Sequence, residues 1–150
     1  MKMHQTRFTT SLLFLLVIGF SVGASGQDFE ETKRLAEQGD GVAQFNLGTM
    51  YTSGLGVPQN AAEAVRWYRL AAEQGHAQAQ SNLGLMYDNG EGVPENNFRA
   101  YVWFSVAAAQ GDEDAREGRD IVAERLTPDQ LARGQELATR CFESDYQDCE

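Results

Sequence analysis

Hydrophobic and small residues return at an interval of 36 residues along most of this chain. The stretch "NLGTMYTSGLGVPQN" begins at Asn46, and "NLGLMYDNGEGVPEN" begins at Asn82. When residues 43–78 are aligned with residues 79–114, 18 of the 36 positions are identical. A unit that cannot bury its apolar face alone gains a core by stacking on a copy of itself, so this repetition predicts a repeat architecture.

Each unit predicts two helices joined by a loop. Leu47, Gly48 and Tyr51 recur at the spacing of one helix face. Gly54 suits a left-handed C-cap, and the "GLGVP" that contains Gly56 predicts a loop. After Asn60, a favourable N-cap, the apolar stripe of the second helix consists of Ala64, Trp67, Tyr68, Ala71 and Ala72, and Gly75 ends it. The corresponding framework residues of the next unit are Leu83, Gly84, Tyr87, Gly90, Gly92, Trp103 and Gly111.

Glycine occupies the same helical register twice, at Gly48 and Gly84. A glycine inside a helix costs roughly 1 kcal/mol relative to alanine. We therefore expect a neighbouring helix to approach closely at both positions.

The periodic pattern changes at both ends. "DFEETKRLAEQG" predicts one amphipathic helix, a half unit over residues 28–39, with Phe29, Leu35 and Ala36 on its apolar side. At the other end Arg119 and Asp120 stand where the pattern requires Leu and Gly, so the segment after Gly111 is not a third copy. It still predicts a helix, with Asp112 as N-cap and with Ala115, Ile121, Val122 and Leu126 as inward positions.

"LTPDQ" predicts the start of one more helix, because Thr127, Pro128 and Gln130 form an N-cap, a first-turn proline and a capping box. Leu131, Leu137, Ala138 and Cys141 are expected to face inwards. The expected organisation is therefore repeats over residues 27–112, capping helices over 113–142 and an acidic tail over 143–150 that is loose except where Cys149 ties it back.

The first 26 residues have the three parts of a secretory signal peptide. Lys2 and Arg7 precede an apolar run over residues 11–22, and small residues follow, with cleavage expected near Ala24 or Gly26. A membrane anchor is the alternative, but the run is shorter than the roughly 20 residues a spanning helix needs. We expect a periplasmic or secreted protein with no membrane segment after cleavage.

Without residues 1–26 the chain has 10 basic and 22 acidic residues, because that segment holds two of the 12 basic residues and no acidic one. A net charge of −12 disfavours nucleic acid and anionic lipid as partners. Cys141 and Cys149 are expected to form a disulfide in an oxidising compartment, worth about 2.6 kcal/mol in the chain-entropy model, with a reduced pair as the alternative.

Catalytic chemistry has little support in this sequence. After residue 26 the chain has one histidine, His76, at a turn or N-cap position, and one lysine, Lys33. It lacks the signatures of zinc hydrolases, phosphate loops and dinucleotide sites. We predict no catalytic residue, no metal and no cofactor.

Residues 29–116 resemble the Sel1-like repeat, a relative of the tetratricopeptide repeat. The resemblance rests on the period of 36, the "LGxMY" helix, the "GxGVPxN" loop, and a second helix with a Trp, paired alanines and a final "QG". The end of the chain also resembles the C-terminal extension of bacterial Sel1-like proteins. The resemblance implies an all-α, short right-handed α-solenoid of antiparallel helix pairs that serves as a protein-interaction scaffold. One branch of the family is linked to β-lactam hydrolysis, but its cysteine pairs and a Ser-x-x-Lys are absent from this chain.

In tetratricopeptide-type stacks the first helix of each unit lines the concave face. By that resemblance the partner-binding positions are Phe45, Thr49, Thr52, Gln78, Ser81, Leu85 and Asp88, although Phe45 could instead pack on Phe29. We expect the partner to be a peptide or helix of another protein, with basic residues to suit the acidic host. The alternatives are a self-associating structural module and, least favoured, an envelope hydrolase.

Overall fold

The computed structural model describes residues 24–149, and every regular element in that range is a helix. The helices are α1 (Ala24–Glu37), α2 (Gly41–Ser53), α3 (Ala61–Ala72), α4 (Ala77–Asn89), α5 (Asn97–Ala109), α6 (Glu113–Ala123) and α7 (Pro128–Glu143). The predicted apolar run of the signal peptide lies outside the described residues. Among the described helices, none has the length and apolar character needed to cross a membrane.

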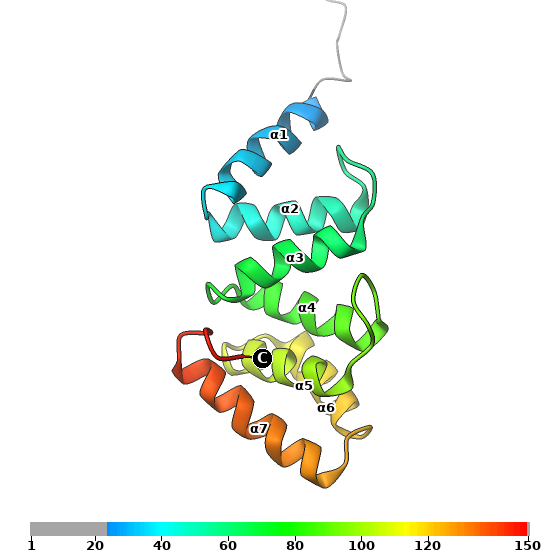
Figure 1. Ribbon diagram of the computed structural model, residues 1–150, viewed down its shortest axis with the longest axis vertical. Helices are drawn as coiled ribbons and strands as arrows, with labels where there is room; N and C mark the ends of the chain where they lie inside the picture. Colours follow the sequence, from blue (N-terminus) through cyan, green and yellow to red (C-terminus); the bar gives the residue numbers. More distant parts are fainter. Residues whose placement is uncertain (1–23, 150) are drawn as a thin grey trace, which may run out of the picture.

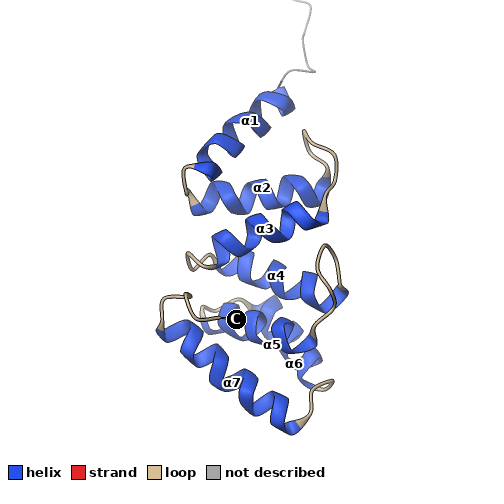
Figure 2. Ribbon diagram, in the orientation of Figure 1, coloured by secondary structure: helices blue, strands red, loops and turns tan. Residues whose placement is uncertain are grey.

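Helices that follow one another in sequence also pack together in space. Within the units α2 packs on α3 and α4 on α5, while α3 packs on α4 and α5 on α6 between units. The stack therefore grows in one direction, from α1 at one end to α7 at the other (Figure 1). Figure 2 shows long loops within the units on one side and shorter turns between the units on the other. The predicted helical solenoid of antiparallel pairs is confirmed.

Local sequence sets the ends of these helices as expected. Gly54 and Gly90 adopt left-handed backbone angles, φ 73° and 68°, directly after α2 and α4. Asn60 and Asn96 cap α3 and α5 by accepting hydrogen bonds from the backbone N–H groups of Glu63 and Arg99.

Close packing occurs at the two helical glycines, against an aromatic ring of the second helix. A Cβ atom on Gly48 would lie 2.7 Å from the ring of Tyr68, and one on Gly84 would lie 2.8 Å from Phe104. Gly118 of α6 approaches Phe104 as well, at 2.9 Å for the same imagined atom. The Phe104 ring thus lies between glycines of two helices, and the predicted close approach is confirmed in this specific form.

A buried glutamine joins each unit to the preceding one. Gln44 and Gln80 are 4% and 0% exposed, and their amide groups donate to the carbonyl oxygens of Ala36 and Ala72 at 3.1 and 3.0 Å. These carbonyls belong to the last turns of α1 and α3, where each also accepts a backbone N–H, that of Gly39 or Gly75, at 3.0 and 2.9 Å. The side-chain oxygens of the two glutamines in turn accept hydrogen bonds from Gln74 and Gln110, at 2.7 and 2.6 Å.

The last two helices both cover α5 and share few contacts with each other. Asp112 caps α6, and Thr127 with Gln130 forms the expected capping box of α7. The inward position predicted for Ile121 is wrong, because its side chain is 48% exposed. The buried face of α6 carries Ala115 and Val122 instead.

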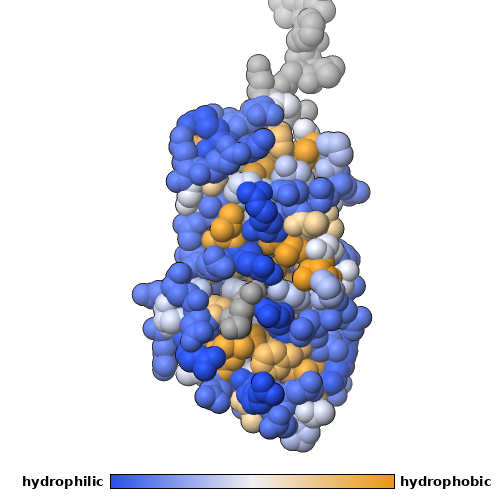
Figure 3. Space-filling view, in the orientation of Figure 1, coloured by the Kyte–Doolittle hydropathy of each residue, from blue (hydrophilic) through white to orange (hydrophobic). Residues whose placement is uncertain are grey.

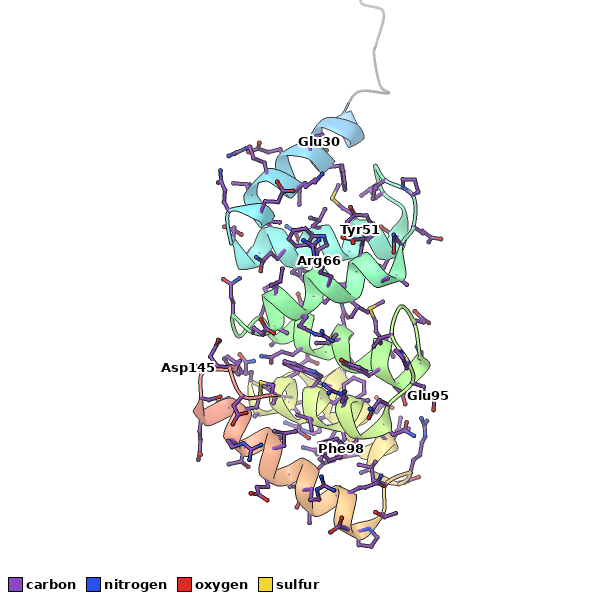
Figure 4. All side chains as sticks on the ribbon, viewed as in Figure 1. Glu30, Tyr51, Arg66, Glu95, Phe98 and Asp145 are labelled. Carbon is purple, nitrogen blue, oxygen red and sulfur yellow. A yellow bond between two sulfur atoms is a disulfide. The ribbon has the colours of Figure 1, made fainter. Side chains whose placement is uncertain are left out.

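The acidic tail is held by more contacts than the expected disulfide at Cys149. The Tyr146 ring packs on Gly75 in the turn between α3 and α4, where a Cβ atom would lie 2.6 Å from the ring. The Gln147 amide donates to the Glu73 carbonyl at 3.0 Å, and a disulfide joins Cys141 to Cys149. Figure 4 shows Asp145 of this tail on the same side of the stack as that turn. The tail is therefore held at both α7 and the first full unit.

Gly84→Ala is expected to destabilise the protein despite the better helix propensity of alanine. The propensity gain is about 1 kcal/mol, whereas overpacking a filled core costs about 1–3 kcal/mol, and Gly118 blocks the retreat of the Phe104 ring. Urea unfolding measures the change. Adding Phe104→Leu should make the double variant more stable than the sum of the two single effects predicts. A Gly84→Ala protein more stable than the wild type would contradict the close packing.

The variant with Cys141→Ser and Cys149→Ser is expected to lose about 2.6 kcal/mol of unfolding free energy, and its α7 amides should exchange faster with solvent. Asp148→Asn is the control, because it removes only the half-exposed ion pair with Arg140 and should cost less than about 1 kcal/mol. Equal stability of the double serine variant and the wild type would show that the disulfide does not secure the tail.

Candidate functional site

The predicted binding positions lie on α2 and α4, the first helices of the two units. Thr49, Thr52 and Gln78 are exposed, and Ser81 is half-buried. Leu85 is 50% exposed, which is high for a leucine on a packed helix. These residues therefore belong to a surface and not to the core.

Phe45 packs against α3 and against the N-cap residue of α4. Its ring stacks on His76 with 4.5 Å between ring centres and lies 5.9 Å from Tyr68. Phe29, the other partner considered from the sequence, instead meets Tyr51 edge-on at 5.8 Å. Phe45 thus helps to join α2 to α3 and to the start of α4, and it offers only part of its ring to a ligand.

The two threonines of α2 are hydrogen-bonded within the protein. The Thr49 and Thr52 hydroxyls lie 3.2 and 3.5 Å from the Tyr68 hydroxyl, and each also donates to a backbone carbonyl of α2. This half of the face is therefore polar, uncharged and internally satisfied.

Asp88 joins the ends of α4 and α6. Its carboxylate accepts a hydrogen bond from the Arg125 guanidinium at 2.6 Å, and its side chain is only 16% exposed. Asp88 therefore links the end of α4 to the turn after α6.

Ile121 is a surface residue that the sequence reasoning missed. It lies 36 residues after Leu85, as Leu85 lies 36 after Thr49, so the three occupy equivalent positions on α6, α4 and α2. Extending the repeat spacing beyond the point where Arg119 and Asp120 break the pattern would have found it.

His76 acts as the N-cap of α4, as predicted. Its Nδ1 accepts a hydrogen bond from the Ala79 backbone N–H at 3.4 Å. Partial burial against the Phe45 ring lowers the pKa of His76 below its ordinary value of 6.5. Across residues 24–149, no three His, Cys, Asp or Glu side chains are grouped so that they could hold a metal ion.

A groove of about 600 Å³ lies between α5, α6 and α7, away from every predicted binding position. Tyr101 and Ser105 of α5, Leu131 and Phe142 of α7, and the charged Arg119 of α6 are among its lining residues. On the face seen in Figure 3, hydrophobic residues appear as separate patches between hydrophilic ones, and one patch lies beside α7.

The family model for the Sel1 repeat matches residues 41–76 and 77–112. This chain is a Sel1-like repeat protein. The two matched repeats begin at α2 and α4, so each contains one first helix, its loop and one second helix. Sel1 repeat proteins are generally protein-interaction scaffolds.

Two solved structures resemble the Sel1-like protein described here. One is a protective antigen of uropathogenic Escherichia coli strains with an SLR fold (TM-score 0.76, 34% identity, 81% of this chain and 26% of that chain). The other is a Sel1 repeat protein from Oxalobacter formigenes (TM-score 0.65, 31% identity, 81% of this chain and 52% of that chain). This chain thus spans about a quarter of the first relative and half of the second. Comparison with curated proteins gave no match.

Stability is expected to fall as the pH is lowered through about 6.5, in part because of His76. Its folded pKa lies below the unfolded value, so the unfolded state binds the proton first and the contribution of neutral His76 is lost below pH 6.5. The melting temperature of wild type and His76→Asn, measured from about pH 7.5 to pH 5.5, tests this. The asparagine variant keeps an N-cap and should show a flatter profile, and identical profiles would contradict the assignment.

Proposed function

We propose that this protein is a non-catalytic interaction scaffold of the bacterial cell envelope, and that it binds a peptide or helix of another protein on the face formed by its first helices. One observation carries the proposal. The framework residues are identical in the two repeats, whereas the outward positions differ, as in Thr49 against Leu85 and Thr52 against Asp88. Leu85 adds an exposed apolar anchor to that variable face.

The location in the envelope is supported by the N-terminal sequence and by the cysteines. The basic start, the apolar run over residues 11–22 and the small residues after it are typical of an export signal. The disulfide between Cys141 and Cys149 suits an oxidising compartment. The similarity to bacterial Sel1-like structures agrees with such an origin.

Affinity capture from a bacterial envelope extract tests the proposed binding face. We expect the wild type to retain a partner, and Leu85→Asp to lose it by at least about tenfold, because a carboxylate replaces the apolar anchor. Leu55→Asp is the matched control, since Leu55 is 60% exposed in the loop between α2 and α3. Circular dichroism shows whether both variants stay helical.

Two results would contradict this proposal. Retention of the partner by Leu85→Asp would place binding on another surface of the stack. Failure of the wild type to retain any protein would remove the evidence for a scaffold.

A further inference from the structure

The variable face has an apolar centre in its C-terminal half. Leu85 on α4 and Ile121 on α6 occupy equivalent repeat positions, and their side chains are 50% and 48% exposed. α4 and α6 are in contact, and the Asp88–Arg125 ion pair holds their ends together. The two side chains therefore form one apolar row across adjacent helices.

Carboxylates flank this row on α6. Asp114, Glu117 and Glu124 precede or follow Ile121 by seven, four and three residues, so all four share one side of the helix. With Glu113, Arg116 and Asp120 they line a shallow hollow of about 450 Å³ on α6.

The carboxylates of Asp114, Glu117 and Glu124 are available to form ion pairs with a partner. Glu113 and Asp120 are paired with Arg116 and Arg119, but within residues 24–149 neither Asp114, Glu117 nor Glu124 forms an ion pair. Their exposed negative charges attract cations and repel anions at distances of up to about 10 Å.

The N-terminal half of the same face lacks carboxylates on its first helix, α2. On α2 the position equivalent to Leu85 is Thr49, whose hydroxyl is hydrogen-bonded to Tyr68, and Phe45 is stacked on His76. The position equivalent to Glu117 is Phe45, and the one equivalent to Glu124 is Thr52. Val42 of α2 is 60% exposed, but α2 has no acidic residue, so exposed apolar side chains have unpaired carboxylates beside them only where α4 meets α6.

We propose that this C-terminal half of the face, the Leu85–Ile121 row with its flanking carboxylates, is the docking surface for a basic amphipathic segment of another protein. Two apolar side chains of that segment cover Leu85 and Ile121, and its Lys or Arg residues pair with Asp114, Glu117 and Glu124. This inference rests on the proposed scaffold function and specifies the chemistry of its partner.

The negative charge of this surface favours a basic peptide segment over other partners. A second copy of this chain would bring an identical row of carboxylates against the first, and the two would repel each other. Nucleic acid and anionic lipid carry the same sign as this surface and are repelled too. A basic peptide segment gains both the apolar contact and the ion pairs.

Fluorescence anisotropy with a labelled amphipathic helix of Lys and Leu tests the inference, and a helix of Glu and Leu of equal length is the negative probe. We expect the Lys/Leu helix to bind, more weakly at about 300 mM salt than at about 50 mM. The double variant Glu117→Gln, Glu124→Gln should weaken binding about tenfold. Glu136→Gln with Glu143→Gln on α7 is the control of equal charge change and should stay within about twofold.

Ile121→Ser supplies an independent test, because it leaves every charge in place and should still weaken binding about fivefold. Equal weakening by the α6 and α7 glutamine variants would overturn the inference, since the peptide would then follow net charge alone. No binding of the Lys/Leu helix would also overturn it. If Leu85-dependent capture from the envelope extract persists in that case, the scaffold function stands and only the basic partner is rejected.

Discussion

One buried glutamine holds three helices of each repeat boundary in place. The Gln80 side chain lies on α4, donates to the end of α3 at Ala72 and accepts from Gln110 at the turn after α5. A buried amide that lost these partners would cost about 1–3 kcal/mol, so the three helices must meet in one register. Gln44 repeats the arrangement one unit earlier with Ala36 and Gln74. Apolar packing supplies attraction between the units, and this polar contact defines how they are placed.

The array stops where that contact is missing. The residue 36 positions after Gln80 is Arg116, which pairs with Glu113 on the surface of α6. α6 also replaces the Leu and Gly of the first helices by Arg119 and Asp120, so it has no suitable face for a second helix of its own. α7 packs on α5 instead, which leaves the groove between α5, α6 and α7. The change in sequence at α6 thus ends the repetition and produces a new surface.

Features set by a few neighbouring residues could be predicted from the sequence. Gly54 ends α2, Asn60 begins α3, and the period of 36 residues gives the helix pairs. The residues next to Ile121 do not reveal its exposure, which depends on which side of α6 meets α5, and only the 36-residue spacing from Leu85 indicates it. The burial of Gln44 could not be predicted from the sequence either, because glutamine is usually a surface residue. Its burial depends on the ends of α1 and α3, which meet around it only in the folded stack.

The anchored tail makes the two ends of the stack unequal. In a linear array each unit contacts only its neighbours, so either end can open without disturbing the rest. Gln147 donates a hydrogen bond to Glu73, which lies 74 residues earlier in the chain. The Cys141–Cys149 disulfide holds this tail segment to the end of α7. The C-terminal end of α7 can therefore leave the stack only together with the tail contact on the turn before α4. We expect opening to begin at α1, so the chain unfolds in a preferred direction.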